Sequence, residues 1–330
     1  MKKINIKSPT RVDLAGGTLD LWPLYNFVGG AKTVNVAIDI WTQADLEERS
    51  DKSIEIHSLD LKYKKTFSSA AEIVNSPEPE LALFRPLFRY FMPQGGFSLQ
   101  TQSQSPVGGG LGGSSSLVIS MIKALSSWTG KTVGHTHEMV HLAHNIEAEI
   151  LNTPTGTQDY YPAVSGGLNI LKYGFAGIEQ EVLNVKGTPL DEYFLLVNTG
   201  KSHHSGLNNF EVLKNAIQKD KKTMQALRNL SEVALETEAV CRKGVWQELP
   251  QLFQKEYKFR IQLAEAFTSP EIEKLHQISI NAGAEAVKIC GAGGGGCVLV
   301  WVSPDNRQKV ISECQKAGFQ TLNARPVNPI

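Results

Sequence analysis

Residues 106–116 read PVGGGLGGSSS and run directly into the apolar segment LVISMIKAL. A glycine-rich turn at a helix start leaves several backbone N–H groups unpaired, with the positive end of the helix dipole behind them, so it suits a phosphate. The three serines supply hydroxyl groups for phosphate or metal. We therefore predict a phosphate-binding loop formed by Pro106, Gly108, Gly109, Gly110, Leu111, Gly112, Gly113, Ser114, Ser115 and Ser116.

Two common glycine-loop motifs do not account for this stretch. Gly108, Gly110 and Gly113 satisfy GxGxxG, but a dinucleotide-binding fold expects a preceding strand and an acidic residue about 20 residues further on. The first acidic residue after the loop is Glu138, and the loop follows TQSQSP. No Lys-Ser/Thr pair ends the loop, so it is not a Walker A motif either.

A second glycine run lies near the C-terminal end, where Gly291, Gly293 and Gly296 again satisfy GxGxxG. The strand-like segment CVLVWV follows it, which favours a glycine-rich hairpin between two strands. Taken singly, either loop is equally consistent with a tight turn. Two such loops in different parts of the chain would make sense as the two walls of a nucleotide cleft.

Composition limits the classes of protein. The chain has 330 residues, of which 41% are hydrophobic, enough for two domains with real cores. Lys+Arg and Asp+Glu are both 33, so no positive excess indicates a nucleic-acid or anionic-membrane partner. No apolar run follows the N-terminal lysines and none has bilayer-spanning length, so we expect a cytoplasmic protein.

The hydropathy pattern changes along the chain and predicts an α+β fold. Alternating residues over 4–16, 31–49 and 52–59 predict an antiparallel sheet. Helical spacing follows over 80–91, 116–128, 137–151, 208–240 and 246–267. Between and after these helices lie a strand-like segment at 191–200, the glycine-rich hairpin and a last helix near 306–318. A second α+β domain is expected to begin near residue 186.

Three motifs together resemble the GHMP kinase superfamily. PVGGGLGGSSSLVIS resembles its second motif, PxxxGLGSSAA, while SPTRVDLAGGTLD and KICGAGGGGCVLVW resemble the first and third, in the same order. The resemblance implies a two-domain α+β structure, with a ribosomal S5 domain 2-like N-terminal domain (1–185) and a ferredoxin-like C-terminal domain (186–330). It also implies an ATP-dependent phosphotransferase with an alcohol acceptor, and ATP with Mg²⁺ bound between the domains.

The first motif carries information about the acceptor. In sugar kinases of this superfamily it holds an Arg and, nine residues later, an Asp that binds sugar hydroxyls, and Arg11 and Asp20 match that spacing. An Asp carboxylate accepts two hydroxyl hydrogen bonds but repels an anionic acceptor. Gly17 and Thr18 belong to the same predicted substrate loop, which reads GGTLD where relatives commonly read GGGTD. The alternative is that Asp20 caps a turn before LWPLY.

The segment NTPTGTQDYYPAVSGGLNIL (152–171) resembles the GKQDQ…GGLN segment of heptose kinases, which implies that Asp159 is the catalytic aspartate. Such a carboxylate accepts the proton of a sugar hydroxyl as its oxygen attacks the γ-phosphorus, or aligns that hydroxyl. Arg11 is expected to keep Asp159 ionised and to stabilise the transferring phosphoryl group. Thr157 replaces the usual Lys. Without the other motifs, Asp159 would be an ordinary loop residue in an Asx turn.

Magnesium prefers hard oxygen ligands, a few from protein and the rest from phosphates and water. By motif match, Ser114 is the expected hydroxyl ligand and Glu147 the carboxylate. Glu149 is two residues further and should point to a different face of the helix, so the two glutamates are alternatives. A lone Glu on an amphipathic helix is otherwise a solvated side chain.

A sugar that already carries a phosphate would need a cationic pocket. Lys201, His203 and His204 follow the strand FLLVNTG and are candidates for that phosphate or for sugar hydroxyls; a surface loop without a ligand is the alternative. Gly293 and Gly294 complete the predicted substrate set.

The resemblance is strongest to D-glycero-D-manno-heptose 7-phosphate kinases, which implies phosphorylation of the anomeric hydroxyl. Galactokinase or fucokinase activity, a non-catalytic sugar sensor and a Rossmann-type NAD enzyme are the alternatives. A monomer or homodimer with a small-molecule substrate is expected.

Overall fold

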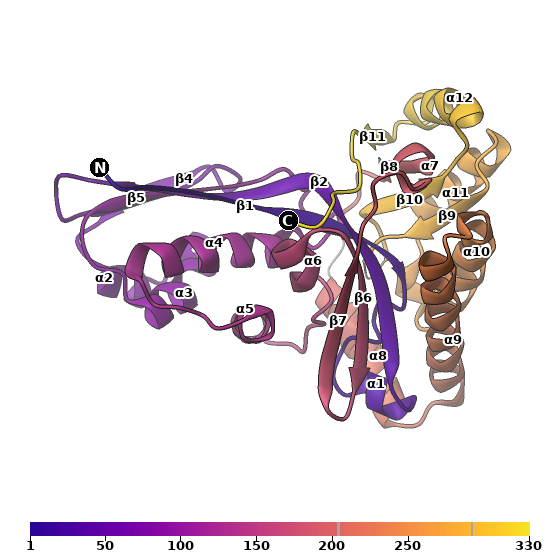
Figure 1. Ribbon diagram of the computed structural model, residues 1–330, viewed down its shortest axis with the longest axis horizontal. Helices are drawn as coiled ribbons and strands as arrows, with labels where there is room; N and C mark the ends of the chain where they lie inside the picture. Colours follow the sequence, from indigo (N-terminus) through magenta and orange to yellow (C-terminus); the bar gives the residue numbers. More distant parts are fainter. Residues whose placement is uncertain (203–204, 292) are drawn as a thin grey trace.

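A computed structural model describes residues 1–202, 205–291 and 293–330 of the chain. His203 and His204, predicted above as candidates for substrate binding, lie outside the described residues. Within them the chain builds two sheets that lie next to one another, each covered by helices (Figure 1). The predicted α+β class is confirmed.

The first sheet is organised around one long strand, β2. Its described strands are β1 (Lys3–Ala15), β2 (Ala31–Glu48), β3 (Ile54–Ser58), β4 (Tyr63–Phe67), β5 (Phe97–Ser103), β6 (Leu168–Gly174) and β7 (Gly177–Leu183). They run in the order β4-β3-β5-β2-β6-β7, and β1 pairs with β2. The predicted antiparallel pairing is confirmed except between β3 and β5, which are parallel. Because β2 pairs with β1, β5 and β6, it connects both ends of the sheet.

Helix α4 (Gly113–Thr129) lies along β1 and β2 (Figure 1). Its N-cap, Gly112, and its C-cap, Gly130, are both in the left-handed region with φ of 68° and 73°, a conformation that glycine adopts without steric cost. The prediction of a glycine loop that leads into a helix is therefore confirmed. The other described helices of this half are α1 (Leu24–Phe27), α2 (Ala70–Asn75), α3 (Phe84–Phe91), α5 (Thr136–Leu151) and α6 (Tyr160–Ser165), with a 3₁₀ turn at Pro79–Leu81.

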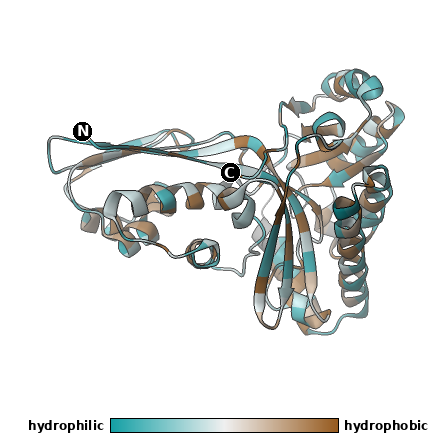
Figure 2. Ribbon diagram, viewed as in Figure 1, coloured by the Kyte–Doolittle hydropathy of each residue, from teal (hydrophilic) through white to brown (hydrophobic). Residues whose placement is uncertain are grey.

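The second sheet has the order β11-β8-β10-β9 and is largely hydrophobic (Figure 2). Its strands are β8 (Phe194–Asn198), β9 (Ala286–Ile289), β10 (Cys297–Trp301) and β11 (Gln320–Leu322). Strands β9 and β10 pair antiparallel, with Ile289 opposite Val298, so the glycine run between them is the predicted hairpin. The described helices of this half are α7 (Leu190–Tyr193), α8 (Ser205–Ile217), α9 (Lys221–Lys243), α10 (Leu249–Arg260), α11 (Pro270–Asn281) and α12 (Pro304–Lys316), with 3₁₀ turns at Trp246–Glu248 and Glu265–Phe267.

The prediction of a continuous helical stretch over 208–240 is wrong. The chain breaks between α8 and α9, where Lys219 takes a φ of 58° and the Asp220 carboxylate accepts the Thr223 N–H at 2.8 Å as a helix cap. Apolar spacing continued through the break because both helices bury a face there. Helix α9 packs on β1 and β2, so it joins the second half of the chain to the first sheet.

The last residues return to the first sheet. The Val327 N–H donates to the Ala37 carbonyl at 2.8 Å, and the Ile330 N–H donates to the Ser165 carbonyl at 2.9 Å. We propose the domain division at 185/186, with this tail crossing back over it. In the described parts of the chain, no helix combines the length and the apolar character needed to span a bilayer.

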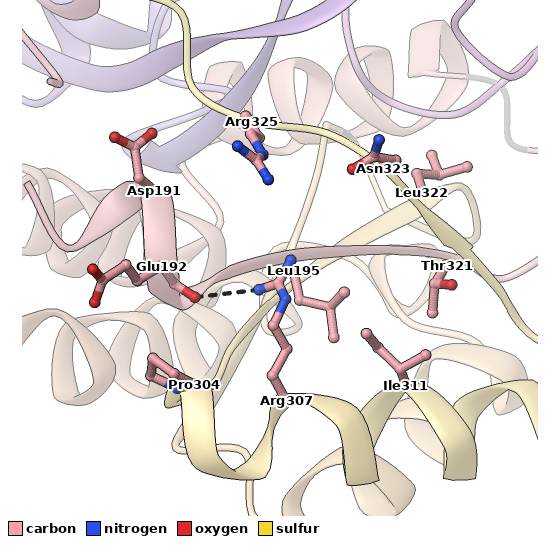
Figure 3. Close-up of a pocket in the computed structure, with 10 residues that line it drawn as sticks. All are labelled: Asp191, Glu192, Leu195, Pro304, Arg307, Ile311, Thr321, Leu322, Asn323 and Arg325. Atoms are coloured by element: carbon pink, nitrogen blue, oxygen red, sulfur yellow. Dashed lines mark hydrogen bonds between the residues drawn. The ribbon is translucent and has the colours of Figure 1, made fainter.

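A pocket of about 660 Å³ opens at the corner between α7, α12 and β11 (Figure 3). Arg307 extends into it and donates to the backbone carbonyls of Glu192 at 3.3 Å and Phe194 at 2.8 Å. None of the residues that the sequence predicts as functional lines this pocket. Arg11, Asp159 and the glycine loop before α4 come together elsewhere.

Candidate active site

The carbonyl groups of the glycine loop before α4 accept hydrogen bonds from the neighbouring strands β1 and β10. The Gly109 carbonyl accepts the Cys297 N–H at 2.8 Å, and the Leu111 carbonyl accepts the Arg11 N–H at 3.0 Å. Between them, the Gly110 carbonyl accepts from Arg11 Nη1 at 2.6 Å. Three consecutive carbonyls therefore point into the protein.

The backbone amides of residues 110–115 in the same loop have no hydrogen-bond partner among the described residues. In a trans peptide the N–H points away from the preceding C=O, so the amides of Gly110, Leu111 and Gly112 face away from the groups that hold the carbonyls. Residues 110–115 donate no hydrogen bond from their backbone amides to any described residue. They include the first turn of α4, whose amides are unpaired in any helix and carry the positive end of its dipole. This arrangement fits a polyphosphate.

The second glycine loop packs directly against the first. A Cβ on Gly291 would lie 2.9 Å from Gly110 Cα, and one on Gly296 would lie 2.9 Å from the Gly108 carbonyl oxygen. Both have φ near 70°, so a side chain would be strained as well as crowded. The two glycine loops are therefore neighbours, and their role as the walls of a nucleotide cleft stays a prediction.

Asp159 lies beside the phosphate loop and is bound to Arg11. Its Oδ1 accepts from Arg11 Nε at 2.8 Å and from Nη2 at 2.6 Å, while its Oδ2 lies against Gly112, where a Cβ would approach it to 3.1 Å. Burial opposes the charge of Arg11, but the carboxylates of Asp159 and Asp13 raise its pKa, so the guanidinium stays charged. One carboxylate oxygen is thus held by Arg11, and the other lies toward the loop.

Asp20 contacts Gln158, the chain neighbour of Asp159. Its Oδ2 accepts the Gln158 N–H at 3.0 Å, and it is only 4% exposed. Burial, with the nearby charges of Asp159 and Asp13, raises the pKa of Asp20 to about 6 against the opposing effect of the Gln158 hydrogen bond. The amide of Asn35 donates to the Gln158 carbonyl at 3.2 Å. Asn35 Oδ1 and Gln158 Oε1 are buried and bond to no described group.

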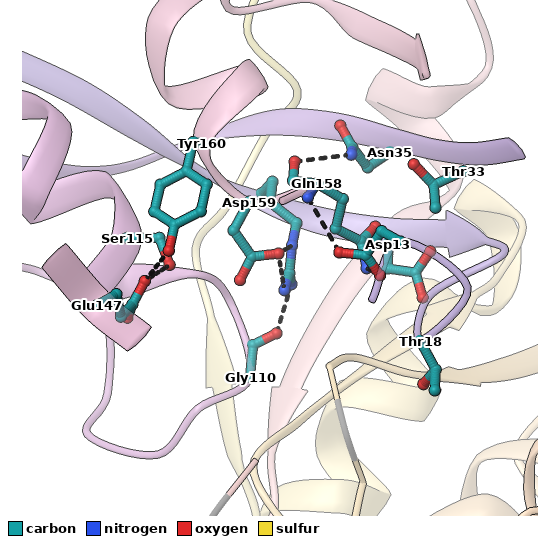
Figure 4. Close-up of polar contacts among 12 residues, drawn as sticks. Asp13, Thr18, Thr33, Asn35, Gly110, Ser115, Glu147, Gln158, Asp159 and Tyr160 are labelled. Carbon is teal, nitrogen blue, oxygen red and sulfur yellow. Dashed lines mark hydrogen bonds and ion pairs between the residues drawn. The ribbon is translucent and has the colours of Figure 1, made fainter. Parts of the chain in front are cut away.

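A second carboxylate, Glu147 on α5, lies at the start of α4. Ser115 Oγ donates to Glu147 Oε2 at 2.8 Å and the Tyr160 hydroxyl donates to the same oxygen (Figure 4). Burial raises the pKa of Glu147, although the hydroxyl groups of Tyr160, Ser115 and Ser114 oppose the shift. Both of these hydrogen bonds go to Oε2, and the hydroxyl of the exposed Ser114 lies close enough to affect the same carboxyl group, so a carboxylate and a hydroxyl oxygen occur together as a hard cation requires.

Comparison with known proteins agrees with this geometry. The family model described as the GHMP kinases N terminal domain matches residues 81–167, and the one described as GHMP kinases C terminal matches residues 237–320. The protein is a GHMP kinase. It is therefore a phosphotransferase that acts on an alcohol group.

Individual relatives of this GHMP kinase differ in their acceptors. The D-glycero-alpha-D-manno-heptose 7-phosphate kinase of Campylobacter jejuni is 28% identical over 96% of this chain and 94% of its own. A mevalonate kinase of Methanocaldococcus jannaschii is 24% identical over 98% and 99%. The structure of a D-glycero-D-manno-heptose 1-phosphate kinase from Bacteriodes thetaiotaomicron superposes with a TM-score of 0.76 at 23% identity, covering 98% of this chain and 96% of its own.

The side chains of two candidate residues, Ser116 and Glu149, do not face the phosphate loop. The Ser116 hydroxyl is buried, and it donates to the carbonyls of Ser8 at 3.1 Å and Pro9 at 2.9 Å. It therefore joins α4 to β1, and we remove it from the candidate ligands. Glu149 is exposed on another face of α5 and pairs with Arg89, so Glu147 is the carboxylate near the loop.

The predicted substrate residues of the second half point elsewhere. Lys201 Nζ is 3.2 Å from Glu271 Oε2 in an exposed ion pair. The Gly294 N–H donates to the Phe267 carbonyl at 3.2 Å, and a Cβ on Gly293 would also meet that carbonyl, at 2.2 Å. These contacts give the tip of the second glycine loop a structural partner and do not bring it to Asp159.

The kinase also contains a buried ionic cluster formed by Asp13, Glu256, Arg260 and Lys288, each at most 1% exposed. Lys288 Nζ is 3.1 Å from Asp13 Oδ2 and 3.2 Å from Glu256 Oε1, and Arg260 contacts both carboxylates. Burial opposes ionisation of Asp13, but the charges of Lys288 and Arg260 hold its pKa below the usual value.

Sequence analysis missed the residues that surround Asp159. Gln158 and Tyr160 are its chain neighbours, so adjacency to a predicted catalytic residue was an available signal. Asn35 carried no signal, because a polar residue in an alternating strand is ordinary. The ionic cluster joins residues up to 275 positions apart, which no local pattern reveals.

Proposed function

We propose that this GHMP kinase transfers the γ-phosphate of ATP to the anomeric hydroxyl of a sugar. The free amides of residues 110–115 support a polyphosphate at the start of α4. Asp159 lies against Gly112 in the same loop, so a hydroxyl next to Asp159 would also be next to the end of that polyphosphate.

The observation that carries the choice of a sugar is the burial of Asp20 beside Asp159. Fold similarity does not decide between acceptors, because a mevalonate kinase from Methanococcus jannaschii superposes with a TM-score of 0.75. A carboxylate acceptor would be repelled by Asp20 and Asp159, and the charge of Asp159 already acts on Asp20. Neutral hydroxyl groups, in contrast, donate to carboxylates.

Two unpaired hydrogen-bond acceptors near Asp20 also support a sugar as the substrate. Asn35 Oδ1 and Gln158 Oε1 are buried without a partner among the described residues. A buried polar atom that stays unpaired costs about 1–3 kcal/mol, so such atoms in a cleft are typically completed by a ligand or water. A polyhydroxylated acceptor supplies the donors that both oxygens lack.

The chemistry follows from the two oxygens of Asp159. Oδ1 is occupied by Arg11, so Oδ2 is the oxygen that accepts the proton of the attacking hydroxyl. The oxygen then attacks the γ-phosphorus, the bond to the bridging oxygen breaks, and ADP leaves. Arg11 holds Asp159 in its orientation, and the Arg11 charge lies near the developing negative charge. Its hydrogen bonds go to Asp159 and Gly110, so its effect on the phosphoryl group acts through space.

We propose that Ser114 and Glu147 hold Mg²⁺ with the phosphates. The donor set is the hydroxyl and carboxylate oxygen that this ion prefers. Bound Mg²⁺ would neutralise charge on the triphosphate. Ser115 and Tyr160 orient the Glu147 carboxylate by holding Oε2.

The proposed acceptor is a heptose 7-phosphate, supported by the full-length similarity to the Campylobacter enzyme. The alternative acceptor is fucose or galactose, which carries no phosphate. The ion pair between Lys201 and Glu271 favours this alternative, because it makes Lys201 less available to a substrate phosphate. We also propose a cytoplasmic location and a monomer or homodimer.

An ADP-release assay over free sugars, sugar phosphates and mevalonate tests the proposal. We expect turnover with one sugar class and a ³¹P signal of an anomeric phosphate in the product. Turnover with mevalonate alone would refute the assignment of the acceptor. ATP binding without turnover of any acceptor would support a sensor instead of a kinase.

A further inference from the structure

The predicted substrate loop with Gly17, Thr18 and Asp20, here called the acceptor loop (residues 16–20), is held by the other half of the chain. Arg260, the last residue of α10, donates from Nη1 to Thr18 Oγ1 at 3.3 Å and from Nη2 to the Gly17 carbonyl at 3.2 Å. We propose that Arg260 and Thr18 form a clamp that fixes the acceptor loop, which makes Arg260 a positioning residue for the acceptor. The inference rests on the proposed function of this site and adds a residue to it.

The clamp is rigid because Arg260 itself is fully anchored. Glu256 Oε1 accepts from its Nε at 2.6 Å, Asp13 Oδ2 lies 3.3 Å from Nη2, and the guanidinium lies over the Phe267 ring. A Cβ on Gly17 would lie 2.4 Å from Asp13 Oδ2 and 3.0 Å from Arg260 Nη2, so the loop closes directly over the ion pair. The buried ionic cluster therefore serves as the base of the clamp.

Thr18 shows why the loop needs to be held. Its φ is 78°, in the left-handed region that β-branched side chains strongly disfavour. Residues held in such conformations persist only where their surroundings determine them, and they concentrate at functional sites. The bond from Arg260 to Thr18 Oγ1 is the specific contact that supports this conformation.

The conformation of Thr18 is transmitted to the acceptor side of Asp159. Its carbonyl accepts the Leu21 N–H at 3.2 Å, which closes the turn that contains Asp20. Asp20 in turn accepts the backbone N–H of Gln158 at 3.0 Å. If Thr18 left this conformation, Asp20 and Gln158 would therefore be displaced. The phosphate loop is bonded to Arg11 and Cys297, and none of its described hydrogen bonds goes to Thr18.

A Thr18 series separates the clamp from simple destabilisation, because it leaves the buried charges in place. Thr18→Val keeps the shape of the side chain but removes the hydroxyl oxygen that accepts the hydrogen bond from Arg260, and Thr18→Ser keeps that oxygen. With the sugar that turns over fastest, we expect Thr18→Val to raise the acceptor KM about tenfold or more with the ATP KM nearly unchanged, and Thr18→Ser to stay within about threefold of wild type. Equal acceptor KM values for the two variants would overturn the clamp.

A second test changes the other partner. Arg260→Lys keeps the charge but removes the planar fork, and Lys255→Met, which breaks an exposed ion pair on the same helix, is the matched control. We expect Arg260→Lys to raise the acceptor KM and Lys255→Met to leave it unchanged. Adding Thr18→Gly to Arg260→Lys should restore much of the loss, because glycine adopts φ near 78° without support. Absence of any rescue would contradict the role assigned to Thr18.

Amide hydrogen exchange keeps this inference distinct from the proposed function. In Thr18→Val and Arg260→Lys, we expect faster exchange over residues 16–21 and unchanged exchange over residues 106–116. Faster exchange at 16–21 in a protein that phosphorylates no sugar would keep the clamp and refute the function. Unchanged exchange at 16–21 would refute the clamp even in an active kinase.

Discussion

Replacement of Asp159 by asparagine tests the proposed chemistry most directly. Asparagine has the same shape, and its carbonyl oxygen replaces Oδ1 as the acceptor from Arg11 Nε and Nη2. Its NH₂ group then takes the place of Oδ2, next to Gly112. The attacking hydroxyl would meet a hydrogen-bond donor where the wild-type protein offers an acceptor, so Arg11 remains bonded while the base is lost.

The expected loss is set by the role of that oxygen. General-base catalysis contributes about 10²–10⁴-fold, so we expect turnover to fall by at least a hundredfold, which corresponds to about 3–5 kcal/mol over that range. A carboxylate that only aligned the hydroxyl would give a loss of about tenfold. The ADP-release assay measures turnover, and calorimetric titration with ATP should show unchanged nucleotide affinity. Glu149→Gln, which removes an exposed carboxylate from α5, is the control. Near-normal turnover of Asp159→Asn would remove Asp159 from the mechanism.

Three further predictions concern the neighbouring groups. The pKa of Asp20 is raised from 3.8 to about 6, so the folded state holds the Asp20 proton more tightly than the unfolded state, and the free energy of unfolding falls as the pH rises from about 4 to 6. In denaturant titrations, Asp20→Asn should therefore increase the free energy of unfolding by up to about 3 kcal/mol at about pH 8 and leave it unchanged at about pH 4. Tyr160→Phe removes a bond that lowers the pKa of Glu147, so Mn²⁺ affinity measured by EPR with a nucleotide analogue should fall about tenfold, more at lower pH. Gly112→Ala and Gly130→Ala should each lower the free energy of unfolding, measured by thermal unfolding, by about 1–2 kcal/mol, because both glycines have positive φ. Only the new methyl group at position 112 would contact Asp159, so only Gly112→Ala should reduce turnover. Equal turnover of the two variants would contradict a role for this contact.

The sequence was informative wherever a function depends on neighbours in the chain. The phosphate loop, helix α4 and the glycine hairpin each follow from a local pattern of glycine and apolar residues. Arg11 and Asp159, 148 positions apart, were found only through resemblance to known motifs, and the structure joins them by hydrogen bonds. A single sequence carries no local signal for such a pair.

Side-chain direction was the main source of error. The run Ser114–Ser116 supplies three similar hydroxyl groups, yet successive helical residues point about 100° apart. Ser114 is exposed, Ser115 bonds to Glu147, and Ser116 bonds to β1. Composition treats them as equivalent, whereas the packing of α4 on the sheet gives each a different role.

The buried ionic cluster also bears on how this protein could be recombined with its relatives. Asp13 belongs to the first half of the chain, while Glu256, Arg260 and Lys288 belong to the second. A hybrid that received its second half from a relative without the cations at positions 260 and 288 would bury Asp13 without a counterion, at a cost of about 3–5 kcal/mol. Evolution and protein engineering alike would therefore have to exchange these four residues together, even though none of them faces the substrate.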